Sequence, residues 1–124
     1  MVLCDTDVII EFFKGNVSAK NILENDISPE NIALSSISVM ELYFGAKSKK
    51  ELILIKKFLS NFEISRLNEE ITDLSLSLIE IYSKSHGLKI PDALIVATSI
   101  YNKIPLFTYN KKDFNFIKEL KLYS

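Results

Sequence analysis

Short apolar runs that alternate with longer helical patterns constrain this chain more than any other feature. The runs with the length and character of strands are 2–4, 31–35, 62–64 and 106–108. Helical patterns lie between them, over 8–13, 17–25, 36–46, 49–61, 68–86 and 91–102. Strands joined by helices are typical of a parallel sheet that is covered on both faces. The sequence therefore predicts a three-layer α/β/α sandwich.

Length and composition limit the classes of protein to which the chain can belong. A chain of 124 residues with 48% hydrophobic content builds one ordinary core, so we expect one domain over 1–124. A net charge of -1 argues against a generally basic nucleic-acid-binding surface. The single cysteine, Cys4, fits a reducing compartment, and we expect a buried thiol. With no signal peptide or membrane-spanning run in the sequence, we expect a soluble, cytoplasmic protein.

Four carboxylates fall where the predicted strands and helices meet. Asp5 follows the first strand, Glu41 lies in the helix after the second, Asp92 begins a helix, and Asp113 follows the last strand. Parallel sheets place their sites at the carboxyl ends of the strands, so we expect these acids to gather at one edge. Glu41 shares a helical stripe with Ile37, Met40 and Phe44, which predicts a glutamate among core residues that needs a compensating cation or donor.

Each acid also has a purely structural explanation. Asp5 is in position to cap the helix that begins at Thr6, and Asp92 to complement a helix dipole. Asp113 suits a turn or a cap, and Glu41 could pair with a nearby lysine. Any one of these explanations is adequate alone. Four such coincidences at matching strand edges are a weaker explanation than one shared site.

Grouped carboxylates predict a hard divalent cation. They repel one another unless a cation lies between them, and oxygen-only sites suit Mg²⁺ or Mn²⁺. Such ions activate water for phosphodiester hydrolysis. A zinc site is not indicated, because the only histidine, His86, lies at a helix end away from any ligand cluster. Three glycines with no phosphate-binding pattern weaken a nucleotide-binding alternative.

The ordered motifs resemble those of PIN-domain nucleases, and among them the VapC-type toxins. The matching stretches are LCDTD at 3–7, SVMELYFGA at 38–46, PDALIVA at 91–97 and LFTYNKKDF at 106–114. The resemblance implies an α/β/α sandwich and a Mg²⁺- or Mn²⁺-dependent endoribonuclease. It also implies a homodimer, and a cognate antitoxin that inserts a segment across the active site.

Carried over by position, the resemblance assigns catalytic and metal-binding roles. Asp5, Glu41 and Asp92 match the core acids of the family, and Asp113 matches the fourth, less constant one. Many PIN domains have an acid where this chain has Asn110, which leaves Asn110 as a supporting hydrogen-bonding residue.

Three further residues near these acids have predicted roles. Thr6 and Thr108 are expected to orient carboxylates or water. Asp7 replaces a commoner small polar residue, and it either adds charge to the site or faces solvent, with the second interpretation favoured.

An RNA substrate requires positive charge near the acidic site. Lys111 and Lys112 lie beside the last motif, and a richer basic stretch covers 47–57. Either set is a candidate for RNA binding or a solvated face. Adjacent Phe12 and Phe13 indicate extra apolar surface, which either joins the core or forms a groove for another chain.

Two rival functions are compatible with the length of the chain. A receiver domain uses an acidic Mg²⁺ pocket, but it needs an aspartate after a central strand, and the stretch 52–57 has none. A catalytically silent PIN-like module for binding protein or RNA would keep the fold without the chemistry.

Overall fold

The computed structural model describes residues 1–124 and is built on a parallel four-stranded sheet. The strands are β1 (Val2–Cys4), β2 (Ile32–Ser35), β3 (Glu63–Ser65) and β4 (Leu106–Phe107), in the order β3-β2-β1-β4. Leu3 in β1 is level with Ala33 in β2 and with Leu106 in β4. Both central strands are fully buried, as near-continuous apolar runs predict for a sheet covered on two faces. The strand predictions are confirmed, with small shifts at their ends.

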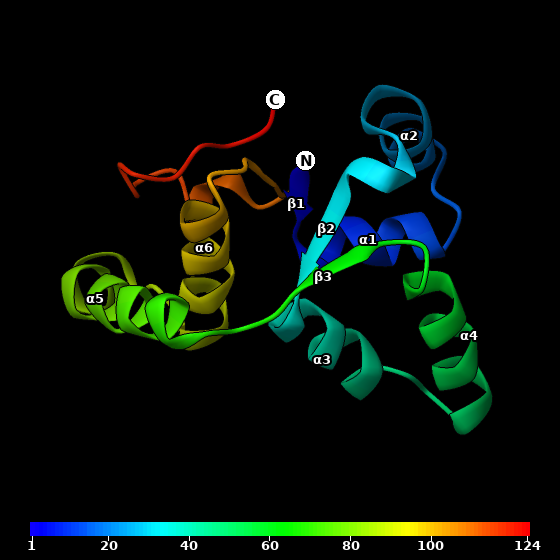
Figure 1. The fold of residues 1–124 in the computed structure, drawn as a ribbon, viewed down its shortest axis with the longest axis horizontal. Helices are drawn as coiled ribbons and strands as arrows, with labels where there is room; N and C mark the ends of the chain where they lie inside the picture. The colour runs from blue at the N-terminus through cyan, green and yellow to red at the C-terminus, as the bar shows by residue number, and fades with distance from the viewer.

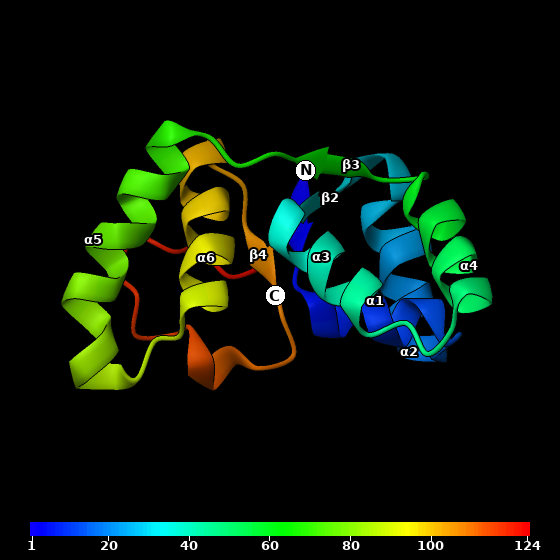
Figure 2. The same ribbon diagram turned by 90° about the horizontal axis from the view of Figure 1, so that it is seen from below.

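Helices cover both faces of the sheet (Figures 1 and 2). They are α1 (Thr6–Phe13), α2 (Val17–Asn21), α3 (Ser36–Phe44), α4 (Lys49–Leu59), α5 (Glu69–His86) and α6 (Ile90–Asn102). Helices α5 and α6 lie on one side, and α1, α2 and α4 lie on the other. The predicted three-layer sandwich is therefore confirmed. The helix predicted over 17–25 is α-helical only to Asn21 and continues to Ile27 as wider π-helical turns. No helix is long and apolar enough to span a membrane.

Each face of the sheet has its own apolar core. On the α1 side, the Phe58 ring lies 5.2 Å from Phe12 and 5.3 Å from both Phe13 and Phe62, between ring centroids. Phe12 is buried and Phe13 is half-buried against this cluster, so the adjacent phenylalanines belong to the core. Cys4 is buried in the same core, as predicted. The α5–α6 side has a second core that includes Phe114.

The outer edge of β4 is paired by a later segment of the chain. The Leu106 N–H donates to the Lys121 carbonyl (2.9 Å), and the Tyr123 N–H donates to the Leu106 carbonyl (2.8 Å). Leu122 thereby forms a parallel bridge with Leu106. The segment 121–123 thus satisfies backbone groups that an edge strand would otherwise leave open.

Helix α3 corrects one prediction from the sequence. Its buried side chains are Ser38, Val39 and Leu42. The stripe that contains Glu41 is on the outer side, where Met40 is 56% exposed and Phe44 is 93% exposed. Helical spacing identified a real stripe but not which stripe faces the core, because α3 is apolar on more than one side. Glu41 is therefore exposed and is not a buried charge.

Gly87 provides a first testable prediction. It ends α5 with φ +70°, in the left-handed region, and a Cβ atom there would meet no neighbour within 4 Å. Gly87→Ala is expected to lower the free energy of unfolding by about 1 kcal/mol, measured by urea denaturation, from backbone strain alone. Gly87→Asn is the control and should cost less, because asparagine tolerates this conformation. An alanine variant of wild-type stability would contradict the assignment.

Candidate active site

Asp5 lies where the carboxyl ends of β1 and β4 meet, and both of its carboxylate oxygens are held. Oδ1 accepts from the Thr6 N–H (2.8 Å), which caps α1. Oδ2 accepts from the hydroxyl of Thr108 (2.8 Å), the first residue after β4. The Asp5 side chain is only 7% exposed. Asp5 thus caps α1 with one oxygen and bonds Thr108 with the other, so its carboxylate is fixed in one orientation at the edge of the sheet.

Glu41 reaches the same edge from α3. Its Oε1 accepts from the Thr6 hydroxyl (2.7 Å), so Thr6 connects the end of β1 to α3. The alternative that Glu41 pairs with a lysine is wrong, because the one ion pair in the chain joins Lys14 and Glu11. Glu41 is thereby oriented by a neutral donor and has no lysine within ion-pair distance.

Asp92 and Asp113 line the same small cavity. Asp92 is in the first turn of α6, and Asp113 ends the short 3₁₀ helix Lys111–Asp113 that follows β4. Both line a hollow of about 90 Å³, together with Lys89, Lys112 and the turn His86–Leu88. The backbone N–H of Asp113 donates to the Asn110 carbonyl (3.0 Å) within this turn, and the Asp113 side chain is exposed.

The four acids lie close enough together for their charges to affect the pKa values of Asp5 and Asp92. Burial raises the pKa of Asp92 to about 6, and the charges of Asp5, Asp113 and Glu41 contribute to that rise while Lys89 opposes it. Burial also raises the pKa of Asp5. The hydrogen bonds from Thr108 and Thr6 oppose that shift, and the charges of Glu41 and Asp113 add to it. Asp5 and Asp92 therefore lie in the electrostatic field of the other predicted acids. A cation bound between them would relieve this repulsion.

Asp7 does not face solvent, so the favoured interpretation of this residue is wrong. It is half-buried, and its Oδ2 accepts from the Tyr109 N–H (3.2 Å) and from the Asn110 side-chain amide (2.9 Å). Its Oδ1 is buried without a partner. Burial and the charge of Asp5 raise the pKa of Asp7 to about 6, against the effect of its backbone donors. The Asn110 N–H donates in turn to the Thr108 hydroxyl (3.0 Å), so Asp7 and Asn110 fix the loop after β4.

The four acids can be compared with the ligands that a hard divalent ion such as Mg²⁺ or Mn²⁺ requires. These acids supply only carboxylate oxygens, they repel one another, and Asp5 and Asp92 are partly desolvated, all of which favour such an ion. No three acids lie close enough together to hold one ion in this arrangement. Glu41 and Asp113 are exposed, so protein atoms do not enclose their side chains. The residues thus fit by chemistry and charge, and coordination requires side-chain rotation.

This charge balance predicts a pH-dependent stability. Asp7 and Asp92 have pKa values of about 6 in the folded chain, against an ordinary value of 3.8. Their protonation stabilises the folded state fully below the unfolded pKa, and that stability is lost as pH rises through the folded value. Without divalent ions, Tm should fall between about pH 4 and pH 6. Added Mg²⁺ or Mn²⁺ should raise Tm more near neutral pH than at about pH 4.5, with KCl of equal ionic strength as the control. Equal shifts at both pH values would contradict this account.

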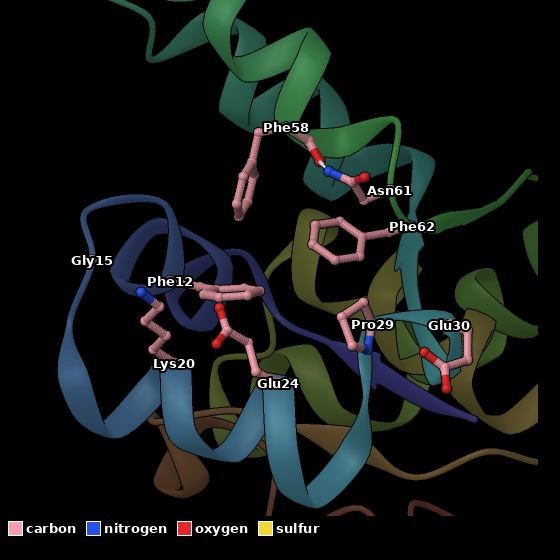
Figure 3. Close-up of a pocket in the computed structure, with 9 residues that line it drawn as sticks. All are labelled: Phe12, Gly15, Lys20, Glu24, Pro29, Glu30, Phe58, Asn61 and Phe62. Atoms are coloured by element: carbon pink, nitrogen blue, oxygen red, sulfur yellow. Dashed lines mark hydrogen bonds between the residues drawn. The ribbon is translucent and has the colours of Figure 1, made fainter.

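Two larger cavities lie on the α1 side of the sheet. One of about 600 Å³ lies between the α1–α2 region and α4, where the rings of Phe12, Phe58 and Phe62 gather (Figure 3). It contains none of the predicted site residues. A second, of about 430 Å³, has mainly apolar walls between α1, α3 and α4, with Glu41 among its lining residues. The largest cavity is therefore remote from the acids, while the second touches them.

Sequence reasoning missed Lys89, and it did not foresee that Asp7 is half-buried. Lys89 lies two positions before Pro91 and lines the cavity of Asp92. A cation just ahead of an acidic helix start is a signal that could have identified it. Asp7 is half-buried because its side chain bonds the loop 109–110, and no local pattern in the sequence predicts the path of that loop. Lys112 lines the cavity and Lys111 does not. The sequence alone cannot distinguish these adjacent lysines.

Comparison with known proteins gives consistent matches over the whole chain. The PIN domain profile matches residues 2–120. Ribonuclease VapC1 of Methanocaldococcus jannaschii is 36% identical over 98% of this chain and 86% of its own length. A toxin–antitoxin complex from Klebsiella pneumoniae contains a chain of 35% identity, with a TM-score of 0.81 over 97% of this chain and 95% of that one. VapBC2 from Rickettsia felis, bound to a DNA fragment from its promoter, gives 30% identity and a TM-score of 0.84 over 99% and 98%.

Proposed function

The chain belongs to the PIN-domain family, and we propose that it is a metal-dependent endoribonuclease that serves as the toxin of a toxin–antitoxin pair. The single observation that carries the proposal is that Thr6 hydrogen-bonds both Asp5 and Glu41, while Asp92 and Asp113 line one cavity and lie close enough to these two acids for their charges to interact. The similarity to ribonuclease VapC1 along almost the whole chain supports the same activity. The receiver-domain alternative lacks both forms of support.

The four acids would hold the metal, with Mg²⁺ or Mn²⁺ as the ion that their oxygens suit best. When bound, the ion lowers the pKa of its coordinated water and stabilises the negative charge that develops on the cleaved phosphate. The chain's own residues position these acids. Thr108 and the Thr6 N–H fix both oxygens of Asp5, while the Thr6 hydroxyl orients Glu41. Cys4 is not suited to act as a covalent nucleophile here, since it is buried and its pKa is raised to about 12.

The test is RNA cleavage by the purified chain in Mg²⁺ or Mn²⁺, with EDTA as the control. Structured and unstructured RNAs should both be included. Cleavage that depends on the ion, and that EDTA abolishes, is the expected result. Failure of the folded, antitoxin-free protein to cut any RNA in a broad panel would favour a silent binding module. That alternative has a structural basis, because no three acids lie close enough together to bind one ion.

Thr108→Val tests how far activity depends on a fixed Asp5. The change removes the donor to Asp5 and the acceptor for the Asn110 N–H while keeping the size of the side chain. Cleavage is expected to fall by about tenfold, as for other groups that orient metal-binding residues. Thr108→Ser keeps the hydroxyl and should retain most of the activity. If the valine variant cuts RNA at the wild-type rate, this hydrogen bond has no role in positioning.

Partners follow from the same proposal. The apolar cavity between α1, α3 and α4 includes Glu41, so an antitoxin segment bound there would reach the acids. Exposed Met40, Tyr43 and Phe44 give α3 an apolar surface suited to a homodimer contact. An RNA substrate and a buried free thiol both fit a cytoplasmic protein. Co-purification with the product of a neighbouring gene, and loss of cleavage in that complex, would test the antitoxin.

A further inference from the structure

The cavity beside Asp92 and Asp113 combines charges of both signs in a way that the proposed metal site does not explain. Lys89 lies at the start of α6 and Lys112 lies in the 3₁₀ helix after β4, yet both line the same hollow of about 90 Å³. The two lysines come from segments that are far apart in the sequence. The fold therefore brings two cations to the edge of the acidic site.

Neither lysine forms an ion pair with an acid, although the charge of Lys89 acts on Asp92. The one ion pair in the chain is Lys14–Glu11, so Lys89 and Lys112 lie farther than ion-pair distance from Asp92 and Asp113 even though all four line one cavity. An exposed ion pair would contribute little, and here none forms. The lysines are thus free for an external anion, just as the acids are free for an external cation.

The backbone on both sides of the cavity is fixed. The His86 ring stacks on Phe116 at 4.3 Å between centroids, with the ring planes 13° apart. The Lys89 carbonyl accepts from the Ala93 N–H (2.9 Å) at the start of α6. On the other side, the Phe114 N–H donates to the Lys111 carbonyl (3.1 Å), and Phe114 is buried. The lysines are therefore presented from two rigid segments, which lowers the entropy cost of binding.

We propose that this cavity binds a phosphate group of the RNA strand, next to the phosphate that is cleaved, with Lys89 and Lys112 as its cationic ligands. The inference rests on the proposed nuclease function and names the part of the substrate that this side of the site contacts. The hollow of about 90 Å³ is small, and the two lysines that line it match a single anionic group such as a phosphate. Phosphate contacts of this kind supply affinity and register without reading sequence.

The experiment compares Lys89→Ala and Lys112→Ala with Lys111→Ala. Lys111 is the matched control, because it is exposed in the same 3₁₀ helix and does not line the cavity. Each cavity variant is expected to raise KM by about tenfold with little change in kcat. Binding of a labelled single-stranded RNA is measured in parallel, in an Asp5→Asn background that prevents cleavage and keeps a helix-capping side chain. There the slope of log affinity against log salt should become shallower by about 0.7 for each phosphate that a lysine no longer neutralises.

The outcomes separate this inference from the proposed function. If all three lysine variants behave alike, the lysines provide only general surface charge and the inference is overturned. The same holds if kcat falls while RNA binding is unchanged. If the wild type binds RNA without cutting it, the nuclease proposal fails. Selective weakening of RNA binding in Lys89→Ala and Lys112→Ala would then still support the phosphate site. If the wild type neither cuts nor binds RNA, both proposals are wrong.

Discussion

Asp92→Asn is expected to reduce RNA cleavage by about 100-fold or more, because it removes a carboxylate charge that holds the metal, and the metal in turn stabilises the charge that develops on the phosphate. Asp92 interacts electrostatically with all three other acids, since the charges of Asp5, Asp113 and Glu41 each raise its pKa. The substitution is nearly isosteric and keeps a polar group in the first turn of α6. The measurement is kcat/KM on a cleaved RNA at saturating Mn²⁺, with circular dichroism to verify the fold.

Two further readouts make the Asp92 prediction specific. Removal of one repelling, partly desolvated charge should raise the stability of the metal-free protein and reduce the rise in Tm on metal addition. Asp73→Asn is the matched control, because Asp73 is an exposed acid in α5 outside the site. It should leave both cleavage and metal response unchanged. An Asp92 variant that retains more than about a tenth of the activity would remove Asp92 from the proposed machinery.

Phe114→Ala is expected to cost about 3–5 kcal/mol of unfolding free energy, a large share of the roughly 5–15 kcal/mol typical of a domain. Phe114 is 1% exposed and packs in the core on the α5–α6 side. It directly follows the 3₁₀ helix that contains Lys112 and Asp113. Its truncation should therefore leave a cavity and loosen this side of the site together. Urea denaturation gives the free energy, and cleavage at a temperature where the variant stays folded gives the effect on the site.

The chain offers a matched control for this prediction. Phe44 is 93% exposed, so Phe44→Ala deletes the same atoms without leaving a cavity and should change stability by less than about 0.5 kcal/mol. Comparable destabilisation of the two variants would mean that burial does not determine the cost. Since Phe44 lies on the apolar face of α3, its variant also reports on self-association, by sedimentation at high concentration.

The fold could be predicted from the sequence because its local patterns agree with its architecture. Apolar runs as short as Val2–Cys4 become fully buried strands, and the helical patterns between them become the covering layers. The order of the strands could not be predicted, since nothing local pairs β1 with both β2 and β4. The outward stripe of α3 was also beyond sequence reasoning. With apolar residues on several sides, only the tertiary contacts decide that Val39 and Leu42 face the core.

The site was partly predictable for a similar reason. Strand ends and helix starts in a parallel sheet converge, so the positions of Asp5, Asp92 and Asp113 were enough to indicate a shared region. The hydrogen bond from the Thr6 N–H to Asp5 is local, but the hydrogen bond from Thr108 to Asp5 joins residues 103 positions apart, and no local pattern encodes it. The same is true of Asp7, whose partners lie on the loop after β4. The sequence thus indicated which acids gather but not how they are held.

The pairing of Leu122 with β4 has a consequence for how copies of this protein can associate. Open edge strands invite other chains to extend a sheet, which leads to swapped oligomers and fibres. Here one edge is already occupied by the segment 121–123. The other edge is β3, only three residues long, with the exposed charge of Glu63. Both edges thus resist sheet extension. An orderly, reversible assembly of this protein would therefore use its helical faces, where contacts can form and separate without sheet extension and the irreversible aggregation that follows from it.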